Sequence, residues 1–397
     1  VPAPEDGWFL ARKRLTDTRS IGVQELWLMH ESGGKGVQIT TLDAHPHAGE
    51  AAFSPDGSAI WFSTRAGRFE YDQNVHQGTW QLARFDRVLG ETTTVTSLGG
   101  GAVRPTPSPD GRSVALVSRD RTSTVLSIMD VATRSLRRLT NDLDHDQMEG
   151  FELRGAYPRI DWTPDGRSLV YWARGRLWRL DTSTLQRAEI PFTARVDTRI
   201  TAAARRDRRL ERGEVEARVI RWPQRADDGT VYAAALGQVW AIGASTSEPV
   251  TPAGMTAYYP SLSRDQKALA FVSWDDVEGG QVWSGPLGRA RQLTRTPGHY
   301  ASPVYSPDGK AVAFLRGTGA VMSGDDLGAA PSFDLVIAPE RGGDGTRLRS
   351  IPNRGSNSRG PRLQWSADGK RLFWIEDEYP EPRAHEKTLL RSCDLAG

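Results

Sequence analysis

Residues 105–118 read PTPSPDGRSVALVS, and this stretch contains the pattern that decides the fold. Pro109 sets φ at about −65° at the first corner of a turn, Asp110 can hydrogen-bond its own backbone, and Gly111 takes the positive φ that closes a hairpin. The residues that follow, 114–118, are apolar and rich in β-formers. The stretch therefore predicts an antiparallel β-hairpin, with one strand before the turn and one after it.

The same turn recurs along the whole chain, so the sequence is a series of diverged repeats. The clearest copies have Ser or Thr, then Pro, Asp and Gly, at residues 54–57, 108–111, 163–166 and 306–309. Weaker copies lie at residues 226–229, 263–266 and 366–369, and residues 4–7 give an eighth. The turn aspartates are 37 to 63 residues apart. One propeller blade takes about 40–45 residues, so we expect the excess in loops.

Each repeat continues with a third and a fourth strand. Third strands often end in Asp, as in residues 80–86 and 126–130, and fourth strands precede a Leu-Thr or Ile-Thr step, as at residues 139–140. Four antiparallel strands per repeat are the blade of a β-propeller. We therefore predict an all-β fold, a β-propeller of four-stranded antiparallel blades, with eight repeats in seven or eight blades and a single domain over residues 1–397. The first unit lacks most of its innermost strand and the last lacks its outermost, so the mode of ring closure stays open.

Composition and charge exclude several classes of protein. The formal net charge is +2, from 51 basic and 49 acidic residues, which argues against a general polyanion binder. The basic run at residues 205–209 has acidic residues around it and predicts a solvated, partly helical arm, so we expect no nucleic-acid partner. No apolar run is long enough to span a bilayer. The single cysteine, Cys393, excludes an internal disulfide.

The Ser-Pro-Asp-Gly repeats with Leu-Thr outer strands resemble TolB-like β-propellers over nearly the whole chain. Segments between the turns are similar to the propeller region of a family of bacterial, exported amidohydrolases, at residues 99–105, 189–193, 274–280 and 294–300. In that family a metal-dependent TIM barrel follows the propeller. The resemblance implies that this chain itself holds no cofactor, that a divalent metal belongs to a separate catalytic domain, and that the protein is periplasmic or secreted.

The two ends of the sequence bear on the expected partner. The chain begins with Val1 rather than Met and ends at Gly397, before any barrel-like segment. We therefore expect a fragment or one subunit of a larger hydrolase. The expected partner is an amidohydrolase-like catalytic domain or subunit, and the alternative partner is an envelope protein.

One pair of histidines is a candidate metal site. His45-Pro46-His47 has the His-x-His spacing of an amidohydrolase metal centre. Two imidazoles at this spacing can share a metal, because alternate residues of a strand point the same way. The alternative is a polar loop between blades.

An acidic stretch at residues 142–149 is a candidate site for a ligand, a partner or Ca²⁺, because carboxylate oxygens are the ligands that Ca²⁺ prefers. The alternative is a solvated acidic loop, paired with Arg154 or with Arg104 of the preceding blade. The residues predicted to bind a ligand or partner are Arg104, Asp144, His145, Asp146 and Glu149.

A third group is a candidate for catalysis. Asp275, Asp276, His299 and Tyr300 fall on loops of neighbouring blades, which can meet near a central channel. A histidine and a tyrosine beside carboxylates can transfer protons. The alternative is that these residues close the channel or pack on a partner domain.

These observations give three functional hypotheses. The first is a non-catalytic propeller that belongs to an amidohydrolase-like hydrolase and gates substrate access or scaffolds the metal-dependent catalytic domain. The second is a stand-alone TolB-like module that binds a protein or peptide. The third is a propeller lyase or hydrolase with a site in its channel. The chain has no Gly-x-Ser-x-Gly motif, which argues against a built-in serine hydrolase.

Overall fold

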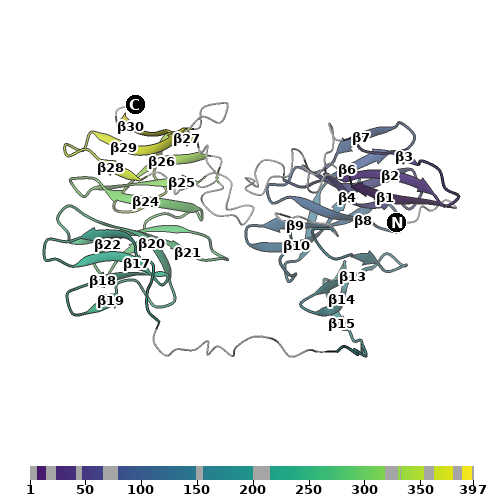
Figure 1. Cartoon of the computed structure of the whole chain (residues 1–397), viewed down its shortest axis with the longest axis horizontal. Helices are drawn as coiled ribbons and strands as arrows, with labels where there is room; N and C mark the ends of the chain where they lie inside the picture. The colour runs from purple at the N-terminus through teal and green to yellow at the C-terminus, as the bar shows by residue number, and fades with distance from the viewer. Residues whose placement is uncertain are drawn as a thin grey trace.

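The structure is a computed structural model that describes residues 7–14, 24–41, 47–65, 79–148, 155–199, 215–317, 330, 332–352, 362–378 and 387–395. All the regular elements in these ranges are β-strands (Figure 1), and most strands belong to four-stranded antiparallel sheets. The fold is therefore the all-β propeller that the repeats predict. Within these ranges no helical segment has the length and hydropathy needed to cross a bilayer. The basic run at residues 205–209 lies outside them.

The first half of the chain builds four units. The first unit has the strands β1 (Trp8–Arg14), β2 (Gln24–His30) and β3 (Val37–Gln38). The second has β4 (His47–Phe53), β5 (Ala59–Arg65), β6 (Gln81–Asp86) and β7 (Glu91–Thr94). The third has β8 (Ala102–Pro107), β9 (Ser113–Asp120), β10 (Ser123–Asp130) and β11 (Leu136–Thr140). The fourth has β12 (Asp161–Trp162), β13 (Ser168–Ala173), β14 (Arg176–Asp181) and β15 (Arg187–Ile190).

The second half builds four more units. The fifth unit has β16 (Arg221–Arg225), β17 (Val231–Ala235), β18 (Gln238–Ile242) and β19 (Ser247–Pro249). The sixth has β20 (Thr256–Leu262), β21 (Ala268–Trp274), β22 (Gln281–Pro286) and β23 (Arg291–Gln292). The seventh has β24 (His299–Tyr305), β25 (Ala311–Gly317), β26 (Ser332–Pro339) and β27 (Thr346–Pro352). The last has β28 (Leu363–Trp365), β29 (Arg371–Glu378) and β30 (Lys387–Asp394).

Both terminal units have three described strands, as the sequence predicts. The first unit contains the second, third and fourth strands of the repeat, and the last contains the first three. A single parallel pair, Gln24 with His47, joins the first unit to the second. All other pairings of named strands are antiparallel. The described strands form seven hydrogen-bonded sheets, because the first and second units share one sheet.

The aspartate of the repeat holds six of the described hairpin turns by the same two hydrogen bonds. In the turn after β8, Asp110 Oδ1 accepts hydrogen bonds from Ser108 Oγ at 2.6 Å and from the N–H of Arg112 at 3.1 Å. Gly111 follows with a φ of 70°. The same two bonds to aspartate recur at Asp56, Asp165, Asp265, Asp308 and Asp368. The predicted hairpins are therefore confirmed.

The sheets pack face to face through apolar side chains. Six buried clusters lie between neighbouring units, three in the first half of the chain and three in the second. Leu126 and Leu169 are fully buried between the third and fourth units, and Leu335 and Leu372 between the seventh and eighth. Burial of each such side chain stabilises the fold by about 1.5–3 kcal/mol.

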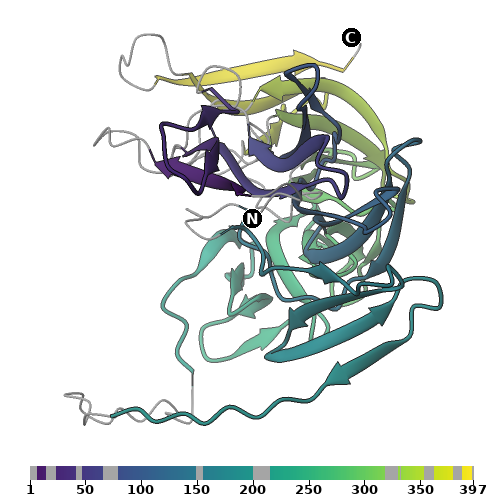
Figure 2. The same ribbon diagram turned by 90° about the vertical axis from the view of Figure 1, so that its right-hand side faces the viewer.

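The two halves of the chain form two groups of sheets (Figure 1). The strands from β1 to β15 contact chiefly one another, and so do the strands from β16 to β30. The segment that follows β15 runs along the lower edge of Figure 2, away from the sheets, and its residues 191–199 form no strand. One hydrogen bond between the groups runs from Thr122 Oγ1 to the carbonyl oxygen of Asp276.

We expect Gly309→Ala to lower the free energy of unfolding by about 1 kcal/mol, because an L-residue is strained at positive φ. Gly309 has a φ of 70°, and an added Cβ would meet no atom within 4 Å, so the strain acts alone. Urea denaturation followed by tryptophan fluorescence measures the change. Lys310→Ala at the neighbouring exposed position is the control, and equal midpoints for the two variants would contradict the prediction.

We expect the protein to lose stability as the pH falls from about 4 to about 2. Hydrogen bonds from Ser54 and Ser58 lower the pKa of Asp56 to about 2, and an unfolded aspartate has a pKa of roughly 3.9. The unfolded state therefore binds more protons in this window, so its population rises as the pH falls. Thermal melting at a series of pH values measures the loss. Asp56→Asn should show a shallower dependence, and identical slopes for both proteins would refute this account.

Candidate functional site

The inner strands carry a repeated β-bulge. In five of them two residues oppose one residue of the second strand, and the first of the two has a positive φ. A β-bulge bends a strand and redirects a side chain. These bulge residues stand six positions before the turn aspartate and are Glu50, Arg104, Trp222, Tyr259 and Ser302.

Glu50 is the centre of a buried polar network that joins three units. Its Oε2 accepts hydrogen bonds from Ser63 Oγ at 2.6 Å and from the N–H of Arg104 at 2.7 Å. Its Oε1 accepts the N–H of Ala156 at 2.7 Å and lies 3.2 Å from an Arg104 guanidinium nitrogen. At Gly155 an added Cβ would overlap both charged groups, so a larger residue would displace this pair. Arg104, predicted as a binding residue, therefore has a buried structural partner.

Two of the three bulge residues of the second half, Trp222 and Tyr259, are aromatic. The rings of Trp222 and Tyr259 lie 4.1 Å apart between their centroids and are tilted by 35°. These side chains come from the inner strands of neighbouring units, as do Glu50 and Arg104 in the first half. The bulges therefore place side chains of successive inner strands in contact with one another.

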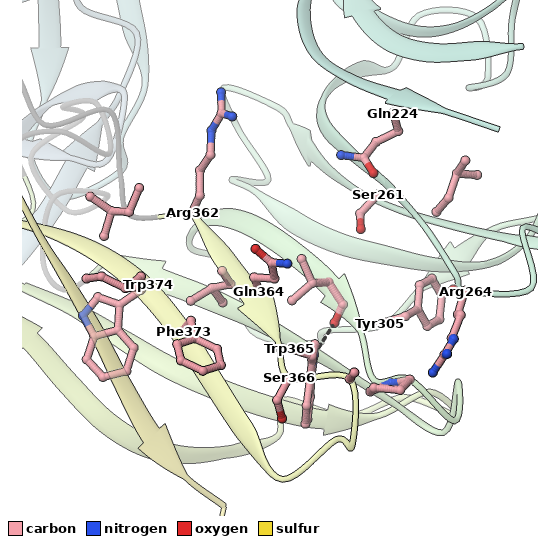
Figure 3. A pocket seen from close by; sticks show the side chains of 17 residues that line it. Gln224, Ser261, Arg264, Tyr305, Arg362, Gln364, Trp365, Ser366, Phe373 and Trp374 are labelled. Carbon is pink, nitrogen blue, oxygen red and sulfur yellow. Dashed lines mark hydrogen bonds between the residues drawn. The ribbon is translucent and has the colours of Figure 1, made fainter. Parts of the chain in front are cut away.

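A cavity of about 710 Å³ lies among the inner strands of the second half (Figure 3). One equivalent position, four residues before the turn aspartate, supplies Gln224, Ser261, Val304 and Gln364, from β16, β20, β24 and β28. Such a volume is typical of a small-ligand or peptide site. Among the described residues, the lining contains no aspartate, glutamate, histidine or cysteine.

Side chains around this cavity are held in place by bonds to the backbone. The indole of Trp365 donates to the carbonyl oxygen of Val304 at 3.2 Å. The hydroxyl of Tyr305 accepts the N–H of Gly285 at 2.9 Å, and burial raises the pKa of this phenol. Tyr305 therefore stays protonated at neutral pH and contributes to the shape of the wall.

The predicted histidine pair is described only in part. His45 lies outside the described residues. His47 is buried at the start of β4, opposite Arg65, with its ring centroid 6.4 Å from that of Trp80. In the described ranges no group of three or more His, Cys, Asp or Glu side chains is placed to hold a metal ion. A metal at His45 and His47 stays a prediction.

The acidic loop is tied down by arginines. Asp146 is buried and paired with Arg119, and its Oδ2 also accepts a hydrogen bond from Thr124 at 2.8 Å. Asp142 pairs with Arg174 and Arg187, and the Arg187 guanidinium lowers the pKa of Asp142.

The other residues of the acidic loop that were predicted to bind a ligand or partner differ in exposure and contacts. Asp144 accepts the backbone N–H of Arg174 at 2.6 Å, and His145 is exposed. Glu149 and Arg154 lie outside the described residues. The described aspartates of this loop thus stabilise the loop itself.

The predicted catalytic group is brought together only in part. His299 is buried and packs on Trp274 with ring centroids 4.7 Å apart, and the Trp274 indole donates to Asp276 at 2.8 Å. Asp275 lies in a turn, where its Oδ1 accepts two backbone N–H groups. Tyr300 is buried, and its hydroxyl donates to the carbonyl oxygen of Thr296 at 2.7 Å.

Burial raises the pKa of Tyr300 to about 12. This phenol therefore keeps its proton at neutral pH, and its hydrogen bond to Thr296 directs the proton into the backbone. In this arrangement the Tyr300 hydroxyl cannot accept a proton as a general base.

Sequence reasoning missed Glu50 and the cavity. The available signal was a residue six positions before the turn aspartate, often followed by proline, as in Arg104-Pro105, Trp222-Pro223 and Tyr259-Pro260. A residue before proline normally adopts an extended conformation. The observed left-handed conformation is the opposite of that expectation, so the local sequence does not predict the bulge.

Comparison with known proteins gives similarity to solved propellers alone. A scan of protein-family models finds no match, and a search of the curated proteins finds no relative. TolB from Acinetobacter baumannii is 17% identical with a TM-score of 0.32, and the alignment covers 89% of this chain and 65% of TolB. This chain therefore spans less than two thirds of the length of that protein.

For two further solved structures, the alignment covers most of this chain and most of the other protein. An oligogalacturonate lyase in complex with manganese is 17% identical, with a TM-score of 0.32 and 98% coverage of each chain. The β-propeller domain of the Trilobed protease from Pyrococcus furiosus is 11% identical, with a TM-score of 0.27 and coverage of 89% of this chain and 97% of that one.

We expect Glu50→Ala to lower the free energy of unfolding by about 3 kcal/mol, because it leaves the partly buried guanidinium of Arg104 without its carboxylate. Urea denaturation measures the loss. The matched control is Glu91→Ala, at an exposed glutamate of β7. If Glu50→Ala were no more destabilising than the control, the network would not join the units as described.

Proposed function

We propose that this chain is the non-catalytic β-propeller of an amidohydrolase-type hydrolase. In this role it binds substrate and controls its access to a metal-dependent catalytic domain, in the periplasm or outside the cell. The observation that carries the proposal is the chemistry of the cavity wall. Its described residues supply amide, hydroxyl, guanidinium and aromatic groups and no carboxylate, imidazole or thiol. These groups can bind a molecule, and none of them is a general base at neutral pH.

The positions that resemble exported amidohydrolases also support a structural role. Two of the similar segments, residues 274–280 and 294–300, pack on each other. Gly280 pairs with Gly298, and an added Cβ at Gly280 would overlap the carbonyl oxygen of Gly298. His299 packs on Trp274 in the same contact. The resemblance to exported amidohydrolases thus includes residues that let two loops of the propeller approach closely. Such residues are required by the propeller fold itself.

The groups predicted to carry out chemistry have structural partners in this chain. The Tyr300 hydroxyl is bonded to the backbone, and Asp275 caps a turn. Metal-dependent hydrolysis would then belong to the partner domain, with a divalent metal that activates water. This division of roles favours the propeller of a larger hydrolase over a self-sufficient propeller enzyme.

We expect the pure chain to turn over no substrate in a panel of amides and lactams. An antibody raised against the chain should precipitate a larger protein from extracts of the source cells. That precipitate should hydrolyse members of the panel, lose activity with EDTA and regain it with Zn²⁺, since the metal lies in the partner domain.

Other results would overturn this proposal. Turnover by the pure chain that His299→Ala abolishes, with folding intact, would indicate a propeller enzyme. Precipitation of the 43.7 kDa chain with an envelope protein and no larger hydrolase would indicate a stand-alone binding module.

A further inference from the structure

Two arginines are the charged residues among the described residues that line the cavity of the second half. Arg264 and Arg362 are both exposed, and neither forms an ion pair within the described part of the chain. The described residues of the cavity wall include no acidic residue, so their formal charge comes from these two guanidinium groups. An arginine fork donates hydrogen bonds to carboxylates in a fixed, planar geometry.

Arg264 is a departure from the repeat. The equivalent position is proline in the four clearest turns, at Pro55, Pro109, Pro164 and Pro307. Residue 266 also differs from the other turns. Those turns have glycine at this left-handed position, whereas here Gln266 adopts a φ of 60°. This turn therefore lacks both the proline and the glycine that its conformation favours. Departures of this kind from local sequence preference are expected at functional positions. The side chain gained by this departure lies in the wall of the cavity.

The two arginines lie at opposite ends of the cavity in Figure 3, with Ser261 and Gln364 between them. The side-chain amides of Gln224 and Gln364 each present a donor and an acceptor, which is the complement of a peptide backbone. Phe373 adds an aromatic surface to the same wall. An extended peptide with acidic ends could pair its carboxylates with both guanidinium groups and hydrogen-bond its backbone to the glutamine amides.

We infer that this cavity binds an extended acidic peptide, with carboxylates held by Arg264 at one end and Arg362 at the other. The inference concerns the ligand of the cavity and needs no hydrolase partner. Peptide binding is measured on the chain alone, so a failure of this inference can be distinguished from a failure of the proposed function.

Isothermal titration calorimetry with hexaglutamate tests the inference. The chain should bind hexaglutamate at low ionic strength, bind it more weakly at about 0.15 M salt, and show no binding of hexalysine. Arg362→Gln should weaken binding about tenfold, because one charge-assisted pair is lost. The matched control is Arg137→Gln, an exposed arginine of the outer strand β11, which should leave binding unchanged.

A second variant separates ligand binding from stability. Arg264→Pro introduces the residue of the four clearest turns, so it should weaken the binding of hexaglutamate about tenfold while leaving the melting temperature equal or higher. Unchanged affinity in Arg264→Pro and Arg362→Gln would overturn the inference, as would equal losses in Arg137→Gln. Tighter binding of an oligomer of uronic acid than of hexaglutamate would overturn the assignment to a peptide.

Discussion

The rest of the structure depends on the bonds of one aspartate at each inner hairpin. At Asp308 the Oδ1 atom accepts Ser306 Oγ at 2.7 Å and the N–H of Lys310 at 3.1 Å, and the glycine between has a left-handed conformation. These bonds fix the register between the inner strand and the strand behind it. A slip of one residue would turn every apolar side chain to the opposite face of the sheet. The clusters between neighbouring sheets therefore require the geometry of the turns.

The repeat builds the blades, and departures from the repeat build the polar features. The bulge residues adopt positive φ in the inner strands, and four of the five stand before proline, where that conformation is disfavoured. Such strain persists only where surrounding contacts over-determine it. At Glu50 those contacts are hydrogen bonds from three units, and at Trp222 they are aromatic contacts with the next blade.

The sequence was sufficient for the fold because its signals are local. Turn residues, strand composition and repeat spacing all act within a few tens of residues, and the eight units and their incomplete ends follow from them. The site was only partly predictable, because its contacts join distant residues. Nothing local indicates that Asp146 pairs with Arg119, that Glu50 bonds Ala156, or that Tyr300 is buried against the backbone. Residues at equivalent positions of four repeats line one cavity only after the inner strands are arranged side by side.

The placement of charge separates two roles within this chain. In the described residues, the carboxylates at Glu50, Asp146 and Asp334 are buried and paired with arginine, so their charge is compensated inside the protein. Among the described residues of the cavity wall, in contrast, the positive charges of Arg264 and Arg362 have no carboxylate to compensate them. Buried, compensated charge favours a rigid scaffold, whereas exposed, uncompensated charge favours an anionic ligand. A propeller with this distribution can hold a substrate, and it leaves the acid–base chemistry to the domain with which we propose it works.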